Sequence, residues 1–234
     1  MDAYETLRKW IASSKQIVVF TGAGISVPSG IPDFRSADGL YRQNEQIHPE
    51  KIISHSFFKN HPDLFFEFYG QKMVYPDALP NAAHRYFASL TNVKAIVTQN
   101  IDGLHQKAGS PCVYELHGSV HRNYCMQCHR FYDLSEIDPC QINYCSCGGI
   151  IKPDVVLYEE PLNEEVVFQA IHAISHADLL IIVGTSLVVY PAAMYLQYFK
   201  GKHVVLINKD KTHYDSKADL VFNEDVVDVI EKIQ

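Results

Sequence analysis

Four cysteines lie in two close pairs that could bind a metal ion. Cys125 and Cys128 form a C-x2-C pair, and Cys145 and Cys147 form a C-x-C pair after a short interval. Two thiolate pairs at such spacing are typical of a four-sulfur zinc site, and four thiolates would leave no open position for water. The spacing therefore predicts a structural zinc ion. The second pair is one residue shorter than the commoner spacing, so Cys140 is an alternative to Cys145 as a ligand.

A glycine-containing segment near the N-terminus could bind phosphate. Gly22 and Gly24 follow a short apolar strand predicted over residues 17–20. Glycines at the end of such a strand let the backbone approach a pyrophosphate and turn its N–H groups toward the anion. The usual pattern G-x-G-x-x-G would need a third glycine where this chain has Val27. By itself, the segment fits a nucleotide site and a plain strand-to-helix turn equally well.

Other polar side chains follow other predicted strands. Asn100 and Asp102 are one residue apart and could together bind an amide-bearing ligand, since a carboxylate accepts from an amide NH2 and asparagine donates to its carbonyl. The alternative is that they cap a helix that starts near Gly103. His117 lies just after a strand, where a partly exposed imidazole is available as a base near neutral pH. The alternative for His117 is an ordinary surface or core histidine.

The elements that position these residues alternate between strand and helix. Strands are predicted at residues 17–20, 94–98, 113–116, 179–183, 203–207 and 219–222, and helices at 2–14, 81–90, 163–176 and from 224 onward. This alternation indicates an α/β fold with a mostly parallel, doubly wound sheet, in which ligands bind at the carboxyl ends of the strands. Because these ends share one edge, the polar clusters should converge on one crevice. That expectation favours a nucleotide site.

Two segments interrupt the pattern. Residues 38–78 are predicted to form short helices broken by prolines, and residues 120–151 form the cysteine-bearing zinc module. The remaining segments, about 1–36, 80–119 and 152–234, are expected to form one Rossmann-like domain. The sequence thus predicts a main domain that carries insertions.

Composition excludes some classes of function. The net charge of -7 argues against general nucleic-acid binding, which needs a basic surface, and is compatible with a basic partner such as a lysine-bearing peptide. The N-terminus has no basic start followed by an apolar run, and we find no apolar run of membrane-spanning length. We therefore expect a cytoplasmic protein that binds neither membrane nor nucleic acid directly.

Taken together, several motifs resemble the sirtuin family of NAD-dependent protein deacylases, in the same order along the chain. The motifs are GAGIS at 22–26, GIPDFRS at 30–36, TQNIDGLH at 98–105, HG at 117–118, the two cysteine pairs, GTSL at 184–187 and the strand end at Asn208. The resemblance implies a Rossmann-like large domain, a smaller lobe made of the zinc module and the helical insertion, and a cleft between them for an acetyl-lysine peptide. It implies NAD and one structural zinc ion, with nicotinamide, O-acyl-ADP-ribose and free lysine as products.

The resemblance also implies roles for individual residues. The NAD phosphates and ribose would be lined by Gly22, Ala23, Gly24, Val27, Phe34 and Arg35, and the adenosine half by Gly184, Thr185, Ser186, Asn208 and Asp225. Gln99 would reach the nicotinamide ribose, and Ile101 and Asp102 would hold the nicotinamide carboxamide with help from Asn100. His117 would be the general base, and Asn100 would belong with it to the catalytic residues. The segment Val155, Val156, Leu157 and Tyr158 would bind the substrate peptide by adding a strand to an exposed edge.

Some positions depart from the family pattern. Relatives that prefer succinyl-lysine carry a tyrosine and, three residues on, an arginine, whereas this chain has Tyr69 with Lys72, or Phe68 with Gln71 in the other register. Neither pair supplies arginine's two donors for a carboxylate, so we expect acetyl or another neutral acyl group to be preferred. Glu159 stands where the family often has glycine, so the loop that clamps the peptide is expected to differ.

The glycine segment is also expected to move. We expect residues 28–42 to form a mobile lid that becomes ordered when NAD binds.

The function has two alternatives. Transfer of ADP-ribose to protein would use the same NAD site with another nucleophile, and a noncatalytic NAD-binding module would share the fold. The presence of His117 and Asn100 favours deacylation over both alternatives.

Overall fold

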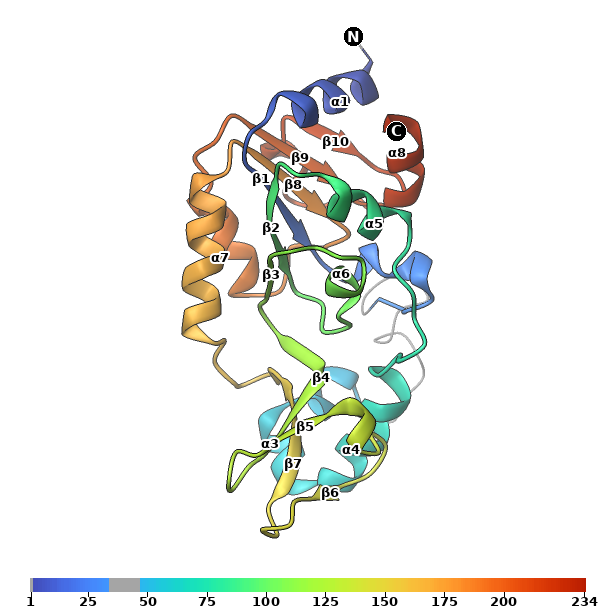
Figure 1. The fold of residues 1–234 in the computed structure, drawn as a ribbon, viewed down its shortest axis with the longest axis vertical. Helices are drawn as coiled ribbons and strands as arrows, with labels where there is room; N and C mark the ends of the chain where they lie inside the picture. The colour runs from blue at the N-terminus through green and yellow to red at the C-terminus, as the bar shows by residue number, and fades with distance from the viewer. Residues whose placement is uncertain (1, 34–46) are drawn as a thin grey trace.

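The computed structural model describes residues 2–33 and 47–234 of the chain. It has a large lobe built on a six-stranded sheet and a small lobe built on a four-stranded sheet and short helices. The two lobes lie one after the other along the long axis of the molecule (Figure 1). The cleft between them is the place where the predicted site residues meet.

The large sheet is entirely parallel. Its strands are β1 (Ile17–Thr21), β2 (Val93–Thr98), β3 (Val113–Glu115), β8 (Leu179–Val183), β9 (His203–Ile207) and β10 (Leu220–Phe222). They lie in the order β10-β9-β8-β1-β2-β3, and every neighbouring pair is parallel. This is the order of a dinucleotide-binding Rossmann sheet, with its reversal between β1 and β8. The predicted doubly wound α/β fold is confirmed.

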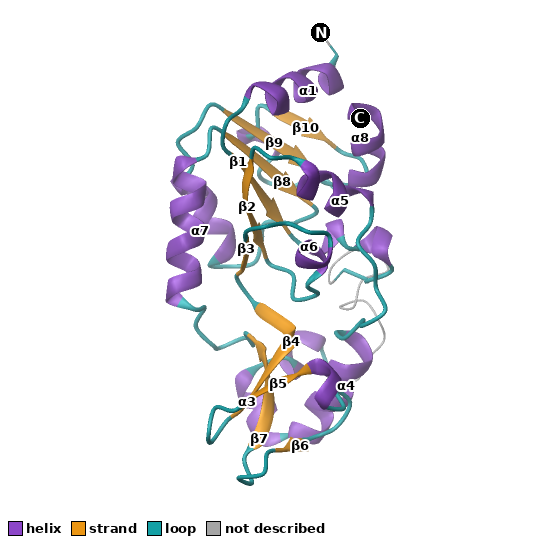
Figure 2. Cartoon of the chain, viewed as in Figure 1, coloured by secondary structure: helices purple, strands orange, loops and turns teal. Residues whose placement is uncertain are grey.

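Burial explains why the central strands have continuous apolar sequences. All residues of β1 and β8 are buried, because helices cover both faces of the sheet. One face packs against α1 (Ala3–Ser13), α5 (Ala82–Ser89) and α8 (Val226–Ile233), and the other against α7 (Glu164–His176) and the 3-10 helix η5 (Ala192–Tyr198). Figure 2 shows these helices on the two sides of the strands.

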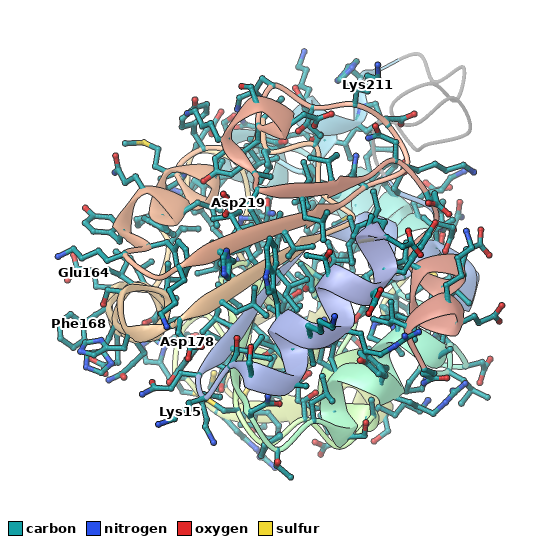
Figure 3. The ribbon with its side chains drawn as sticks, turned by 90° about the horizontal axis from the view of Figure 1, so that it is seen from above. Lys15, Glu164, Phe168, Asp178, Lys211 and Asp219 are labelled. Atoms are coloured by element: carbon teal, nitrogen blue, oxygen red, sulfur yellow. The ribbon has the colours of Figure 1, made fainter. Side chains whose placement is uncertain are left out.

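Short polar side chains fix where these elements begin. Asn81, Asn163 and Asp225 each accept hydrogen bonds from free amides in the first turn of α5, α7 and α8, respectively. Asp178, just before β8, accepts from the amides of Lys15 and Gln16 just before β1, at 2.9 and 3.0 Å. Figure 3 shows Lys15 and Asp178 at the same end of the sheet. These contacts set the register of the two strands that flank the reversal point.

The small lobe combines the zinc module with the helical insertion. Its antiparallel sheet contains β4 (Gly118–Cys125), β5 (Phe131–Asp133), β6 (Asn143–Tyr144) and β7 (Ile150–Val155), in the order β5-β4-β7-β6, with the short helix η4 (Leu134–Glu136) after β5. The insertion forms α2 (Pro49–Ile52), α3 (His55–Asn60) and α4 (Pro62–Lys72), which share an apolar core with β4 and β7. Both of these strands continue past the expected limits of the zinc module.

The turn between the lobes needs a glycine. Gly118 has a φ of 77°, and a Cβ atom there would lie 1.8 Å from the carbonyl oxygen of Asp154 on β7. Only a residue without a side chain lets β4 and β7 approach this closely. This close approach places His117 at the point where the large sheet ends and the small sheet begins.

The described helices are short. The longest of them, α7, has 13 residues, whereas a helix needs about 20 apolar residues to cross a bilayer. No helix within residues 2–33 and 47–234 has the length and apolar character of a membrane span.

Candidate functional site

One cavity brings together the predicted cleft residues. It has a volume of about 1120 Å³ and opens along the carboxyl ends of β1, β2, β8 and β9. Its lining includes Gly22, Ala23, Gly24, Val27, Gln99, Asn100, Ile101, Asp102, His117, Val155, Val156, Leu157, Tyr158, Gly184, Thr185, Ser186, Asn208 and Asp225. The volume exceeds the range of about 300–1,000 Å³ that is usual for one small ligand. The cavity therefore has room for a dinucleotide and an acyl-lysine side chain together.

The glycine turn is built for close packing between two strand ends. A Cβ atom on Gly22 would lie 2.7 Å from the Thr185 side chain, and one on Gly24 would lie 2.7 Å from the Cα of Gly184. The amides of Gly22 and Gly24 donate to the carbonyl oxygens of Val183 and Gly184 at 3.0 and 2.8 Å. The expectation that these two N–H groups face an anion is therefore wrong. In the structure these amides join the turn that follows β1 to the end of β8.

Ala23 differs from the two glycines that flank it. Its amide donates to no backbone carbonyl within the described ranges, and Ala23 lines the cavity. The residues after it form two short 3-10 helices, η1 (Ala23–Ile25) and η2 (Val27–Ser29), in place of a regular α-helix. Val27 stands where the usual pattern has its third glycine, and the turn that contains it differs from the usual dinucleotide-binding turn.

Asn100 and Asp102 are joined through a residue that the sequence did not single out. The Ser26 hydroxyl donates to Asp102 Oδ2 at 2.7 Å, and Asn100 Nδ2 donates to the Ser26 oxygen at 3.0 Å. Ser26 is only 1% exposed, so its hydroxyl is enclosed between the two side chains. Ser26 belongs to the GAGIS motif, but the sequence assigned it no role of its own. Only the fold brings it to Asp102.

Asp102 also has the structural role that was the alternative to ligand binding. Its Oδ1 accepts from the Leu104 amide at 2.9 Å, which begins α6 (Leu104–Lys107). Burial raises the pKa of Asp102, while hydrogen bonds from Leu104, Ser26 and Asn100 and the nearby His121 oppose that rise. The two interpretations of Asp102 are therefore compatible, because different oxygens serve the helix and the serine.

His117 is oriented by a backbone carbonyl. Its Nδ1 lies 2.8 Å from the carbonyl oxygen of Gln99. A carbonyl can only accept, so Nδ1 carries the proton and Nε2 keeps a free lone pair. Burial lowers the pKa of His117, and the bond to Gln99 partly offsets this. The imidazole is therefore neutral near pH 7, half-buried and able to take a proton.

The residues expected at the adenosine half lie at the ends of β8, β9 and β10. Gln99 Nε2 donates to Thr185 Oγ1 at 3.1 Å, which links the two halves of the cavity. Asn208 follows β9, and its Nδ2 donates to the Asp210 carbonyl at 2.7 Å. Asp225 caps α8 by accepting from the Val227 amide at 2.9 Å. These side chains frame the wall of the cavity opposite the small lobe.

The expected substrate segment is only partly a strand. β7 ends at Val155, and the amides beyond it are already used: Val156 donates to the His117 carbonyl, Leu157 to Glu160 and Tyr158 to the Ile53 carbonyl. Less of this edge is therefore open to main-chain pairing than the sequence predicts. The Val156 carbonyl accepts no hydrogen bond from a described residue. It is the open main-chain acceptor of this segment beside His117.

Some predicted residues cannot be placed, and some lining residues were not predicted. Phe34 and Arg35, and with them most of the expected lid at residues 28–42, lie outside the described residues. The lining also contains Tyr75, Glu160, Tyr190 and Lys211, which no motif marked, together with Asp33 of the GIPDFRS motif and Glu159, to which the sequence assigned no site role. All six lie outside the described helices and strands.

The four paired cysteines form one cluster. The Sγ atoms of Cys125, Cys128, Cys145 and Cys147 all lie within 4.8 Å of one another, with Cys125 and Cys147 at 3.4 Å and Cys128 and Cys145 at 3.5 Å. A tetrahedral zinc ion with bonds of about 2.3 Å needs sulfur atoms about 3.8 Å apart, so the donor set fits zinc. Cys140 is outside this cluster and packs against Gly70 of α4. The structure thus favours Cys145 over the alternative Cys140.

Comparisons with known proteins agree with this geometry. Residues 22–191 match the Sir2 family. The chain is 56% identical to the NAD-dependent protein deacetylase of Clostridium perfringens, over 99% of this chain and 98% of that protein. It resembles a solved Sir2 homologue–NAD complex with a TM-score of 0.89 and 36% identity, over 100% of this chain and 92% of that one. It also resembles Sir2 bound to a deacetylated p53 peptide and 3′-O-acetyl-ADP-ribose, with a TM-score of 0.88 and 36% identity over 98% and 96% of the two chains.

Proposed function

The chain belongs to the Sir2 family, and from this premise we propose how the residues of its cavity carry out NAD-dependent deacetylation of protein lysine. The protein is an NAD-dependent protein deacetylase that yields nicotinamide, O-acetyl-ADP-ribose and free lysine. The observation that carries the residue roles is the single cavity in which the neutral His117 and the Ser26 network meet. We propose one catalytic domain with a large and a small lobe, in which β4 and β7 carry the small lobe to residues 118 and 155.

Asp102, Asn100 and Ser26 form the subsite for the nicotinamide carboxamide. Ser26 fixes one oxygen of Asp102 and one hydrogen of Asn100. The Asn100 carbonyl oxygen can accept from the carboxamide NH2, and Asp102 offers a further acceptor beside it. Ile101 adds an apolar wall that keeps water from the reacting carbon.

When NAD is bound, it supplies a ribose carbon that accepts the acyl oxygen as nicotinamide leaves. His117 is the general base of the later step. Its Nδ1–H is held by the Gln99 carbonyl, so Nε2 would be free to take a proton from a ribose hydroxyl of bound NAD. Because the imidazole is already neutral, no prior loss of a proton is needed near pH 7.

The remaining residues bind the two substrates. The Ala23 amide and the Gly22–Val27 turn line the phosphate path, while Thr185, Ser186, Asn208 and Asp225 hold the adenosine half. The Val156 carbonyl accepts from the N–H of the acyl-lysine amide, and Val155 and Leu157 form the apolar side of its channel. Tyr158 is the last residue of this segment, which binds the substrate peptide.

The zinc ion is structural. Cys125, Cys128, Cys145 and Cys147 supply four sulfur ligands, which fill a tetrahedral sphere and leave no position for substrate. The ion would hold the β4–β5 turn to the β6–β7 turn at the far end of the small lobe. It takes no part in proton transfer.

One assay tests the proposal against its alternatives. The protein is incubated with NAD and an acetyl-lysine peptide, and nicotinamide, free-lysine peptide and O-acetyl-ADP-ribose are measured. We expect all three in equal amounts, and a loss of about 10²–10⁴-fold in rate for His117→Ala. Nicotinamide release with label on protein would select ADP-ribosyl transfer, and no NAD turnover would select a binding module.

A further inference from the structure

Glu159 has an unusual backbone conformation at the end of the peptide segment. Its φ is 75°, in the left-handed region that favours glycine. A residue held there costs on the order of 1 kcal/mol or more, so the surroundings must keep it in place. Glu159 follows Tyr158 directly, and both line the cavity.

The α3 helix holds the Glu159 side chain. The Ser56 amide donates to Oε2 at 2.8 Å, and the Ser56 hydroxyl donates to Oε1 at 3.0 Å. These two bonds fix the carboxylate at the cavity mouth, where the residue is exposed to solvent. Both donors are neutral, so the bonds orient the negative charge without cancelling it.

The neighbouring carboxylate gives a contrast. Glu160 lies 2.8 Å from His55 Nδ1 and 3.2 Å from Lys152 Nζ, and it also accepts from the Leu157 amide. Glu160 is therefore paired and serves to hold the segment. For Glu159, residues 2–33 and 47–234 provide no Lys, Arg or His side chain as an ion-pair partner. Its charge remains available to a ligand.

We propose that Glu159 is a specificity-determining residue that selects acetyl-lysine peptides with a basic side chain beside the acetyl-lysine. This rests on the proposed function, because it needs a peptide that lies along residues 155–158. A fixed carboxylate beside a bound chain attracts an adjacent Arg or Lys and repels Asp or Glu. Preorganisation by Ser56 lowers the entropy that such an exposed pair must otherwise lose.

The test uses three acetyl-lysine peptides that differ only in the flanking residues, which are Arg, Gln or Glu. At low salt we expect the kcat/KM of the Arg peptide to exceed that of the Gln peptide by about two- to fivefold, and the Glu peptide to fall below both. The difference should lie mainly in peptide KM and should shrink as salt screens the pair. KM for NAD should not change between peptides.

Glu159→Gln removes the negative charge of the side chain but keeps its contact with α3. Glutamine keeps one oxygen that can accept from the Ser56 amide, and its NH2 can donate to the Ser56 hydroxyl oxygen, so the α3 contact persists while the charge is lost. We expect this variant to lose the Arg-over-Gln preference and to keep wild-type turnover of the Gln peptide. Glu164→Gln is the matched control, because Glu164 lies on the outer side of α7, away from the cavity (Figure 3). The control should keep the full preference.

Direct binding of fluorescent versions of the same peptides measures the preference for the Arg peptide independently of turnover. No preference in the wild-type protein, or a preference that survives in Glu159→Gln, would overturn the role of Glu159. Failure of the wild-type protein to turn over the Gln peptide with NAD would instead overturn the proposed function. The two failures are therefore distinguishable.

Discussion

At the scale of single residues, His117 sets the pH dependence of the reaction. Its neutral form is the base, and burial lowers its pKa below the ordinary value of 6.5. Lowering the pH through that pKa protonates Nε2, so kcat/KM should be constant near pH 7 and fall only in more acidic buffer. A profile of kcat/KM against pH checks this. A midpoint above pH 7 would show that another group is the base or that His117 has a raised pKa.

Ser26 should matter for NAD, although the sequence assigned it no role of its own. Its hydroxyl contacts both Asp102 and Asn100. Ser26→Ala removes a hydrogen bond to a carboxylate and one partner of the Asn100 amide, so KM for NAD should rise by about tenfold or more. Steady-state kinetics at saturating peptide measures this. Ser13→Ala, at an exposed hydroxyl on α1, is the control and should behave as wild type.

Succinyl-lysine should be a poorer substrate than acetyl-lysine. Tyr69 is fully buried and stacks on Phe65, so its hydroxyl is not part of the cavity lining, and Phe68 and Gln71 are not part of it either. Lys72 lines the cavity, but one ammonium group is a poorer partner for a carboxylate than arginine's two donors. We expect kcat/KM to favour the acetyl peptide by about tenfold or more. A higher value for the succinyl peptide would contradict this.

At the scale of elements, the zinc cluster should decide whether the small sheet forms. Structural zinc sites contribute on the order of 10 kcal/mol to the folding of small modules. Cys125→Ala should therefore lose zinc, loosen β4 to β7 and abolish deacetylation indirectly. Zinc content, circular dichroism and activity measure the three effects. Cys140→Ser is the matched control, because Cys140 lies outside the cluster, and it should bind one zinc ion and remain active. A folded, active Cys125→Ala protein without zinc would refute the assignment.

At the scale of the whole molecule, two buried histidines should make the fold sensitive to acid. His84 and His105 lie in the core beneath the cavity with ring centroids 4.8 Å apart. Burial lowers their pKa values to about 4 and about 3, respectively. The unfolded chain binds these protons near pH 6.5, so stability falls as the pH drops below that value. Between pH 6.5 and pH 5 the loss should be about 3 kcal/mol for the pair.

Urea unfolding at several pH values measures this loss. His84→Leu should remove about half of the pH dependence, because one protonation step disappears while the site stays apolar. Lys59→Leu, at an exposed position on α3, would be a control for a change of the same kind at the surface. Equal slopes for wild type and His84→Leu would mean that His84 is not held neutral in the core.

The sequence alone determined the chemistry that depends on local order. The cysteine spacing predicted the zinc ligands, the alternation of apolar strands and helices predicted the Rossmann-like sheet, and the strand-end residues such as Asn100, Asp102 and His117 predicted the cavity lining. Each of these signals lies within a few residues of chain, where periodicity and spacing act directly.

Only the tertiary structure decided which atoms of those residues are free. It showed that the amides of Gly22 and Gly24 are used by the β8 turn, that Ser26 joins Asp102 to Asn100, and that Ser56 holds Glu159 in a left-handed conformation. Each of these contacts joins segments far apart in the chain. A hydrogen bond depends on distances within a few tenths of an ångström. Sequence spacing cannot fix such distances until the strands and lobes have packed.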